Sequence, residues 1–316
     1  MKKKLFRLAL LTALVSALLI AGASATSEQP AGEGTAADPY RISNADELYW
    51  FAQSGDLSAS AVLTADITIN ENVLNAEGGL NTATGLTKWT PIGSSDSTPY
   101  TGTFDGDGHT ISGLYVDVSS SSDFVYAGLF GVVGSGGTVK NLSIADSYIS
   151  GSATGYYAYA NVGGVCGNNI GGTITNCSVS ATVTGSAYGY PSVYAYAGGV
   201  CGYNYGAIMN CYSTGKAYAN AICEGMDNTP FIRYGKVCGV NDGTITNCYW
   251  LGTSYDIGIG YDNGTATNVA SKTADEFASG EVTWLLNGGE QMDGPWRQNL
   301  GEGGDIYPPS TPRTAW

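Results

Sequence analysis

Short runs of alternating apolar and polar residues recur along the chain, and each run ends at glycine or asparagine. One unit contains Val-Cys, a Gly/Asn turn, the run Thr-Ile-Thr-Asn-Cys and then a further run at 178–184. Alternation with a period of two is typical of β-strands. Glycine and asparagine accept the positive φ that tight corners need. The pattern therefore predicts three short strands in each unit and no helix inside it.

Whole units repeat, turn glycines included. GGVCGNNIGGTITNC (163–177), GGVCGYNYGAIMNC (198–211) and GKVCGVNDGTITNC (235–248) place cysteines in two equivalent slots. AGLFGVVGSGGTVKNL (127–142) fills the same slots with Phe130 and Leu142, and a degenerate copy precedes it at 104–114. A core position tolerates this exchange, whereas a metal ligand does not. The two slots are therefore expected to point inward, with no metal site.

A helix-free repeat of about 35 residues predicts an all-β fold, a right-handed parallel β-helix from roughly Val62 to Tyr261, with each coil stacked on the next. The repeats are expected at about 127–162, 163–197, 198–234 and 235–261. The expected inward rows are Phe130/Cys166/Cys201/Cys238 and Leu142/Cys177/Cys211/Cys248. An immunoglobulin-like sandwich is the structural alternative, but it does not explain why the whole unit recurs.

Both ends of the solenoid carry helix signals. Asn44-Ala-Asp-Glu47 reads as a capping box before an apolar face at 48–52, and Thr273-Ala-Asp-Glu276 reads as a second one before apolar positions at 277–286. Gly288 supplies a stop signal. We expect short N- and C-terminal helices that cover the open strand edges.

The first 25 residues have the pattern of a signal peptide: a basic start, an apolar stretch from Leu8 to Ala21 and the small-residue site Ala23-Ser24-Ala25. An uncleaved anchor is the alternative, although the apolar run is short for a membrane span.

Residues 26–37 are predicted to be a flexible linker, and 38–316 a single domain with a C-terminal cap at 271–316. The protein is expected to be secreted, either free in the extracellular space or associated with the cell surface, without a membrane span after signal removal.

Charge narrows the choice of partners. Removal of the signal peptide leaves nine basic residues against 27 acidic ones, a net charge of about −18. Nucleic acid and anionic lipid are therefore poor partners, because the protein would repel them.

The repeats resemble the GLUG motif of bacterial surface proteins. AGLFG (127–131) and GGVCG (163–167 and 198–202) carry the resemblance, and the flanks at 38–52, 89–116 and 273–289 are similar to those of the family. Lys236 departs from the pattern, since the other cysteine copies have glycine there. The resemblance covers 38 to about 307 and implies the β-helix. It implies no single activity, because family members are adhesin-like or accompany the catalytic domain of immunoglobulin A-cleaving metallopeptidases.

Catalytic chemistry has little support in the sequence. His109 is the only histidine, so a two-histidine zinc motif cannot exist, and we expect this residue to have a turn or surface role. Asp105 and Asp107 lie in a glycine-rich turn, and Lys140 and Lys216 in the coils lack a matching carboxylate cluster. A polysaccharide lyase or hydrolase is the enzymatic alternative because some of these enzymes are β-helices. We expect no catalysis and no cofactor.

Tyrosine-rich segments precede each Gly-x-Val-Cys copy, where the unit length varies. They are predicted to be loops or extra strand pairs that project from the coil. Their rings could stack on sugars or on a partner protein, or could simply pack on neighbouring coils. The candidate binding residues are Tyr157, Tyr159, Tyr188, Tyr190, Tyr194 and Tyr196.

Three arrangements of the cysteines are open. The first is a disulfide within each coil: Cys166 with Cys177, Cys201 with Cys211 and Cys238 with Cys248. The others are a bridge between same-slot cysteines of adjacent coils, and unbridged thiols that fill the core. Cys223 has no partner slot and is expected to be free.

These observations favour adhesion or recognition of a glycan, a host protein or a bacterial surface protein. A polysaccharide-active enzyme and a passive spacer remain the alternatives.

Overall fold

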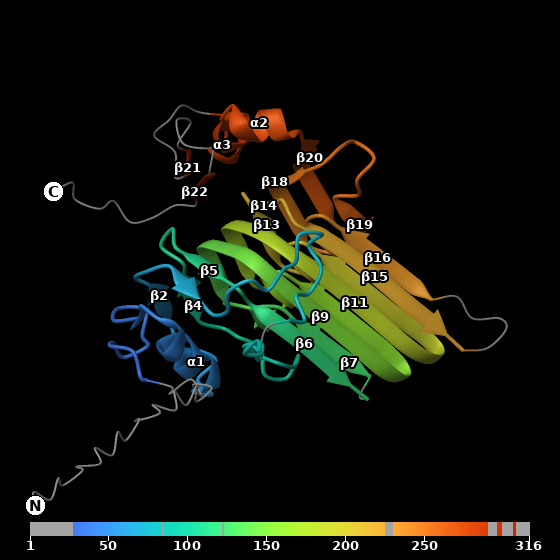
Figure 1. Cartoon of the computed structure of the whole chain (residues 1–316), viewed down its shortest axis with the longest axis horizontal. Helices are drawn as coiled ribbons and strands as arrows, with labels where there is room; N and C mark the ends of the chain where they lie inside the picture. The colour runs from blue at the N-terminus through green and yellow to red at the C-terminus, as the bar shows by residue number, and fades with distance from the viewer. Residues whose placement is uncertain are drawn as a thin grey trace, which may run out of the picture.

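The computed structural model describes residues 28–83, 85–121, 123–224, 230–289, 296–298 and 306–307. Over the described residues, the fold is an all-β solenoid of about four turns, with parallel stacked coils, 55% strand and three short helices. Figure 1 shows the coils stacked along one axis, with the N-terminal segment at one end and the helices α2 and α3 at the other. The predicted parallel β-helix is confirmed.

Two sheets form the walls of the solenoid. In the smaller, five strands stack in parallel in the order β19-β17-β12-β10-β8. Their bounds are Phe130–Gly134 (β8), Cys166–Ile170 (β10), Cys201–Asn204 (β12), Cys238–Asn241 (β17) and Ile259–Asp262 (β19).

The larger sheet has 15 strands, and its two long members, β9 (Thr138–Gly163) and β11 (Thr173–Gly198), run through several corners of a coil. The prediction of separate short strands is therefore wrong for these two coils. The other members are β1 (Tyr40–Ile42), β2 (Ala61–Leu63), β3 (Ile67–Thr68), β4 (Thr103–Asp105), β5 (Thr110–Ser112), β6 (Tyr115–Ser120), β7 (Phe124–Ala127), β13 (Ala207–Met209), β14 (Tyr212–Ser213), β15 (Lys216–Cys223), β16 (Phe231–Gly235), β18 (Thr244–Leu251) and β20 (Thr265–Lys272). A separate antiparallel pair joins β21 (Arg297–Gln298) to β22 (Ile306–Tyr307).

The two predicted inward rows are confirmed. Cys166 is in register with Phe130 on one side and with Cys201 on the other, and Cys201 is in register with Cys238. In the second row, Leu142 is in register with Cys177. All eight residues of the two rows are fully buried.

An asparagine before each second-slot cysteine turns the corner of its coil. Asn141, Asn176, Asn210 and Asn247 all have φ between 51° and 55°, in the left-handed region that asparagine tolerates. Their side chains form a ladder, in which Asn176 Nδ2 donates to Asn141 Oδ1 (3.1 Å) and Asn210 Nδ2 donates to Asn176 Oδ1 (3.3 Å). The Asn-Cys pair thus makes a corner that directs the cysteine inward.

A second asparagine ladder lies in the core at the end of the smaller sheet. Asn169 Nδ2 donates to Asn204 Oδ1, Asn204 Nδ2 to Asn241 Oδ1 and Asn241 Nδ2 to Asp262 Oδ1, each at 2.8 Å. The three asparagines have no solvent-exposed area. The ladder therefore satisfies polar groups that would otherwise be costly to bury.

The first capping helix is α1 (Ala45–Gln53), which buries Leu48, Tyr49 and Phe51. Asn44 accepts from the backbone N–H of Glu47, as the capping box predicts. The Glu47 carboxylate instead reaches back to the backbone N–H and hydroxyl of Ser43.

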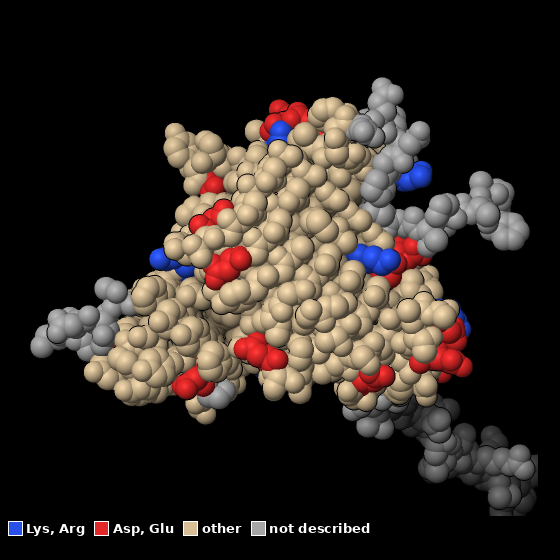
Figure 2. All heavy atoms as spheres, turned by 180° about the vertical axis from the view of Figure 1, so that it is seen from behind, with Lys and Arg blue, Asp and Glu red and all other residues tan. Residues whose placement is uncertain are grey.

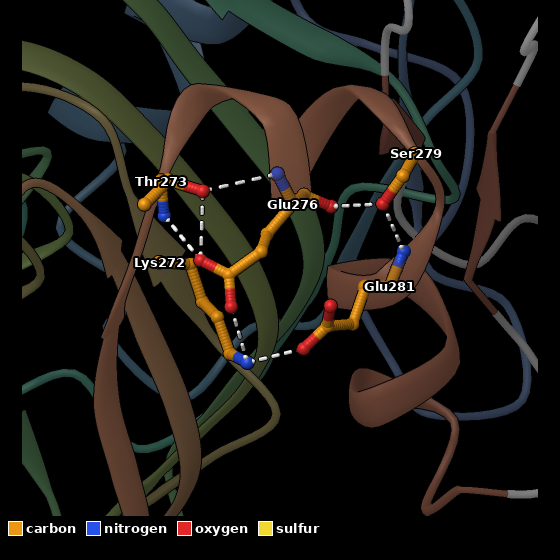
Figure 3. A network of polar contacts seen from close by, with 5 residues as sticks. All are labelled: Lys272, Thr273, Glu276, Ser279 and Glu281. Carbon is orange, nitrogen blue, oxygen red and sulfur yellow. Dashed lines mark hydrogen bonds and ion pairs between the residues drawn. The ribbon is translucent and has the colours of Figure 1, made fainter.

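The C-terminal cap consists of two short helices, α2 (Ala274–Ala278) and α3 (Glu281–Leu286). The predicted capping box is complete: Thr273 Oγ1 accepts from Glu276 N, and the Glu276 carboxylate accepts from Thr273 N (Figure 3). Gly280, with φ of 89°, separates the two helices. Lys272 Nζ, at the end of β20, contacts the carboxylates of Glu276 and Glu281 at 3.1 and 2.5 Å. These ion pairs connect both helices to the last strand of the solenoid.

The N-terminal boundary differs from the prediction. The signal peptide, the start of the predicted linker and most of the C-terminal tail lie outside the described residues. Residues 28–37 pack on the first coil instead of forming a flexible linker, since Arg41 N donates to Ala31 O (2.7 Å) and Ser60 N to Gly34 O (2.6 Å). Among the described residues, none of the helices has the length and apolar character to cross a bilayer.

The core asparagine ladder provides a stability test. Replacing Asn204 with Ala leaves Asn169 Nδ2 and Asn241 Oδ1 without their ladder partner. We expect the free energy of unfolding to fall by about 1–3 kcal/mol, measured by chemical denaturation. The exposed Asn263→Ala is the control, with an expected change within about 0.5 kcal/mol. Equal effects of the two substitutions would contradict a structural role of the ladder.

Candidate functional site

The tyrosine-rich segments form a two-layered projection, which we call the flange (115–127, 147–163, 181–198 and 216–235). In the first layer, β6 pairs with β9, β9 with β11 and β11 with β15. In the second layer, β7, β9, β11 and β16 pair in the same order. The segments are therefore extra strand pairs, one of the two predicted possibilities, and they stack in register like the coils (Figure 1).

Small side chains fill the space between the two layers. The flange core consists of Val125, Ala153, Ala158, Ala160, Ala187, Val193, Ala195 and Ala221. Because side chains alternate along a strand, the large residues between these alanines point outward. This arrangement explains the Tyr-Ala-Tyr pattern: alanine lets the layers approach, and tyrosine covers the outer side.

Four rings stack on the outer side of the second layer. Phe124, Tyr159, Tyr194 and Phe231 form a column, with one ring from each coil. Successive ring centroids are 4.9, 4.2 and 4.8 Å apart, and the ring planes lie within 10° of each other. Both end rings are solvent-exposed, Phe124 by 52% and Phe231 by 41%.

A second group of rings continues this surface toward the smaller sheet. Tyr196 stacks on Tyr203 at 5.6 Å, and the Tyr205 hydroxyl donates to that of Tyr203 at 2.7 Å. Tyr126 donates to Asp96 Oδ2 and Tyr203 to Asp242 Oδ2, each at 2.5 Å. We call the two groups together the aromatic face: Phe124, Tyr126, Tyr159, Tyr194, Tyr196, Tyr203, Tyr205 and Phe231.

Three phenols of the aromatic face, those of Tyr126, Tyr159 and Tyr196, have raised pKa values and are uncharged at physiological pH. Burial, followed by the hydrogen bond with Tyr194, raises the pKa of Tyr159 to about 12. Burial also raises the pKa of Tyr196, and burial together with the Asp96 carboxylate raises that of Tyr126. These hydroxyls remain hydrogen-bond donors, so the face offers apolar rings and neutral polar groups.

The six tyrosines predicted as binding residues lie in three different parts of the flange. Tyr159, Tyr194 and Tyr196 lie on the aromatic face. Tyr157 and Tyr190 each contact Tyr156 edge-on at the flange tip. Tyr188 lies on the outer side of the first layer, where its hydroxyl donates to Glu224 Oε1. None of the six is buried.

Five residues of the aromatic face were missed: Phe124, Tyr126, Tyr203, Tyr205 and Phe231. The signal for the two phenylalanines was present in the repeat period. Positions 124, 159, 194 and 231 are 35, 35 and 37 residues apart, which matches the spacing of the cysteine slots. Tyr203 and Tyr205 gave no such signal, because the positions equivalent to Tyr203 are Asn168 and Val240 in the neighbouring coils. Tyr203 lies in β12 and Tyr205 in the turn that follows it.

The cysteines are all free thiols, so the disulfides predicted within each coil are absent from the structure. The physical reason is that the two cysteines of one coil lie in different sheets. Cys166 in β10 has Cys201 as its register partner. Cys177 in β11 directs its N–H at the sulfur of Cys211, 3.4 Å away. Each cysteine thus adjoins the same slot of the next coil, and the thiols fill the core.

The residues weighed for catalysis have structural partners. His109 is nearly buried, and its Nδ1 lies 3.1 Å from Asp66 Oδ1. Asp105 pairs with Lys140 at 3.1 Å and accepts from Asn141 Nδ2 at 2.9 Å. The Lys216 ammonium donates to Glu77 O at 2.5 Å. Among the described residues, no three His, Cys, Asp or Glu side chains form a group able to hold a metal ion.

The comparisons with known proteins agree with this architecture. The GLUG motif matches residues 158–184 and 194–218. This chain carries the GLUG motif. Both matches run from the second flange layer through β10 or β12, which begins with the first-slot cysteine, to the first flange layer of the next coil. The motif therefore spans elements that build the aromatic face.

Two relatives are similar to part of this chain. Halomucin of Haloquadratum walsbyi is 36% identical over 129 residues, 38% of this chain and 1% of that protein. A protein of Evansella cellulosilytica named as a Gly-rich membrane protein is 32% identical over 150 residues, 44% of this chain and 14% of that protein. The chain therefore corresponds to a small part of each relative.

One solved structure has the same fold. A Bacteroides ovatus protein whose structure is titled as an immunoglobulin A1 protease aligns with a TM-score of 0.50 and 21% identity, over 87% of this chain and 93% of that one. At this identity the likeness concerns the fold alone.

The thiol arrangement is testable by alkylation of the native protein. Burial raises the pKa of the Cys166 and Cys201 thiols well above the usual value, and the thiolate is the reactive form. We expect a thiol reagent to label only the partly exposed Cys223 in the native state. All seven cysteines should be labelled after denaturation without reductant, as counted by mass spectrometry. Only one label after denaturation would instead show three disulfides.

Proposed function

We propose that this chain is a secreted, non-catalytic recognition protein of the cell surface that binds carbohydrate through the aromatic face. The observation that carries the proposal is the solvent-accessible set of aromatic rings that extends over four stacked coils. Exposed aromatic clusters of this extent are uncommon on a surface with no partner. The names of the two relatives, a mucin and a membrane protein, support a place at the cell surface.

The geometry favours particular contact points. In the column of four rings, each ring covers the flat side of its neighbour. The two middle rings, Tyr159 and Tyr194, therefore present only their edges and hydroxyl groups. Tyr205, 53% exposed, and Phe231 at the end of the column offer more of their ring surface. A sugar would stack at these positions, while the phenols would donate or accept hydrogen bonds and the Asp96 and Asp242 carboxylates would accept them.

Electrostatics selects among glycans. Figure 2 shows a broad surface that is mostly uncharged, with scattered acidic side chains and few basic ones. Together with the acidic net charge of the chain, this disfavours polyanionic glycans such as polyuronates. Neutral or amino sugars are the proposed ligands.

Single-ring substitutions test the proposal. A glycan array first identifies a ligand, and calorimetry then measures its affinity. We expect Tyr205→Ala and Phe231→Ala each to weaken binding by about 1 kcal/mol, roughly fivefold, because a stacking contact is lost. Tyr255→Ala is the matched control, since this ring is 94% exposed and lies outside the aromatic face.

The same preparation distinguishes the rival functions. Release of reducing ends or unsaturated products from the bound glycan would replace the recognition proposal with a polysaccharide-active enzyme. Binding that none of the aromatic substitutions changes would refute the role of this face. An array without any ligand would favour a protein partner or a spacer.

A further inference from the structure

The flange ends in an open sheet edge on the C-terminal side. In the part of the chain that the structure describes, β15 and β16 each pair with β11 and with no other strand. The next coil crosses the root of the flange, where Lys236 N donates to Ile257 O at 2.8 Å. There Asp256 and Ile257 line an open hollow together with Lys216 and Tyr218, and the end of a partner's strand would enter this hollow. The outer parts of both strands therefore present one edge to solvent.

The opposite edge of the flange is partly covered by the chain itself. Trp89 N donates to Tyr115 O at 2.7 Å, at the start of β6. Lys88 Nζ lies 2.8 Å from Asp117 Oδ2. Open strand edges readily pair with another chain, and proteins usually cover or blunt them. The contrast between the two ends makes the β15/β16 edge a candidate interface.

We propose that the β15/β16 edge pairs with the same edge of a second copy, antiparallel and about a two-fold axis at Asn220. In this register Lys216 of one copy lies opposite Glu224 of the other, and the symmetry makes two such pairs. Tyr218 lies opposite Ile222 on the same outer side. On the inner side only alanines and Cys223 meet. The strand is thus self-complementary in charge and in size.

Other registers lose this complementarity. A shift of the pairing by two residues places Lys216 opposite Ile222 or leaves Glu224 opposite Tyr218. A shift by one residue directs the outer side chains of one copy to the inner side of the other. Glu224 is in position for pairing because it continues the ladder, its N–H donating to Gly189 O at 2.8 Å.

The two charged side chains can accept these additional contacts. Lys216 Nζ donates to Glu77 O, and Glu224 Oε1 accepts from Tyr188. An ammonium group has three donors and a carboxylate about four acceptor sites, so each retains capacity for a partner. Both residues are solvent-exposed.

The antiparallel arrangement is also compatible with the shape of the chain. The last coil and the helices α2 and α3 lie beyond the β15/β16 level on the side of the flange root (Figure 1). Antiparallel pairing places Lys216, at the root of one flange, opposite Glu224 of the other copy, so the two bodies lie at opposite ends of the paired strands. The inference is independent of the ligand of the aromatic face.

Charge reversal tests the register. Light scattering after size exclusion should show a dimer for the exported full chain, and monomers for Lys216→Glu and for Glu224→Lys, because each variant opposes like charges. An equimolar mixture of the two variants should restore the dimer, since all facing pairs are then opposite. Thermal unfolding of each variant checks that it is folded. A monomeric wild-type chain, or a mixture that stays monomeric, would overturn the proposal.

Cross-linking tests the two-fold axis. Asn220→Cys places two cysteines opposite each other, and we expect a disulfide-linked dimer under mild oxidation, visible on a non-reducing gel. Tyr218→Cys is the matched control, two residues away on the same side, where the two copies' cysteines are four residues apart along the paired strands, about 13 Å. Equal cross-linking of both variants would rule out this register.

Discussion

Parallel, in-register stacking of the coils is the constraint on which the rest of this structure depends. Each coil lies one strand spacing, about 4.8 Å, above the previous one, so equivalent residues of successive coils come into direct contact. The corners must also repeat for this register to hold. The two asparagine ladders meet that requirement, because each amide donates to the equivalent side chain of a neighbouring coil. Backbone geometry and side-chain hydrogen bonding therefore favour the same register.

Stacking converts a residue type that recurs in the sequence into a column in space. Inside the coil, the columns contain buried, unbridged thiols that fill the core. On the flange, the same stacking of coils builds the column of four aromatic rings. Its centroid separations of 4.2 to 4.9 Å are close to the strand spacing. The exposed surface is thus a direct product of the repeat. A binding surface built in this way is extended rather than concave, which suits a polymeric ligand.

The flange also shows how stacking leaves an unpaired edge. A solenoid covers its ends with helices and loops, as α1, α2 and α3 do here. The last coil does not extend into the flange. In this coil the short connection 251–258 takes the place of the long strand pair that the preceding coils contribute to the flange. The open edge at β15 and β16 follows from this difference in length, and its charge pattern fits a second copy of itself.

Sequence alone determined the β-helix, the two inward rows and the capping helices, because these features depend on local turn chemistry and on the repeat period. It also located the tyrosine-rich projections and indicated that their rings were candidates for binding. The choice between disulfides and thiols required the tertiary structure, since spacing along the chain does not reveal that Cys166 and Cys177 lie in different sheets. The composition of the aromatic face required it as well. Tyr203 and Tyr205 come from β12 and the turn after it, whereas Tyr159 and Tyr194 come from the flange. Only the packing of the flange against the smaller sheet brings them onto one surface.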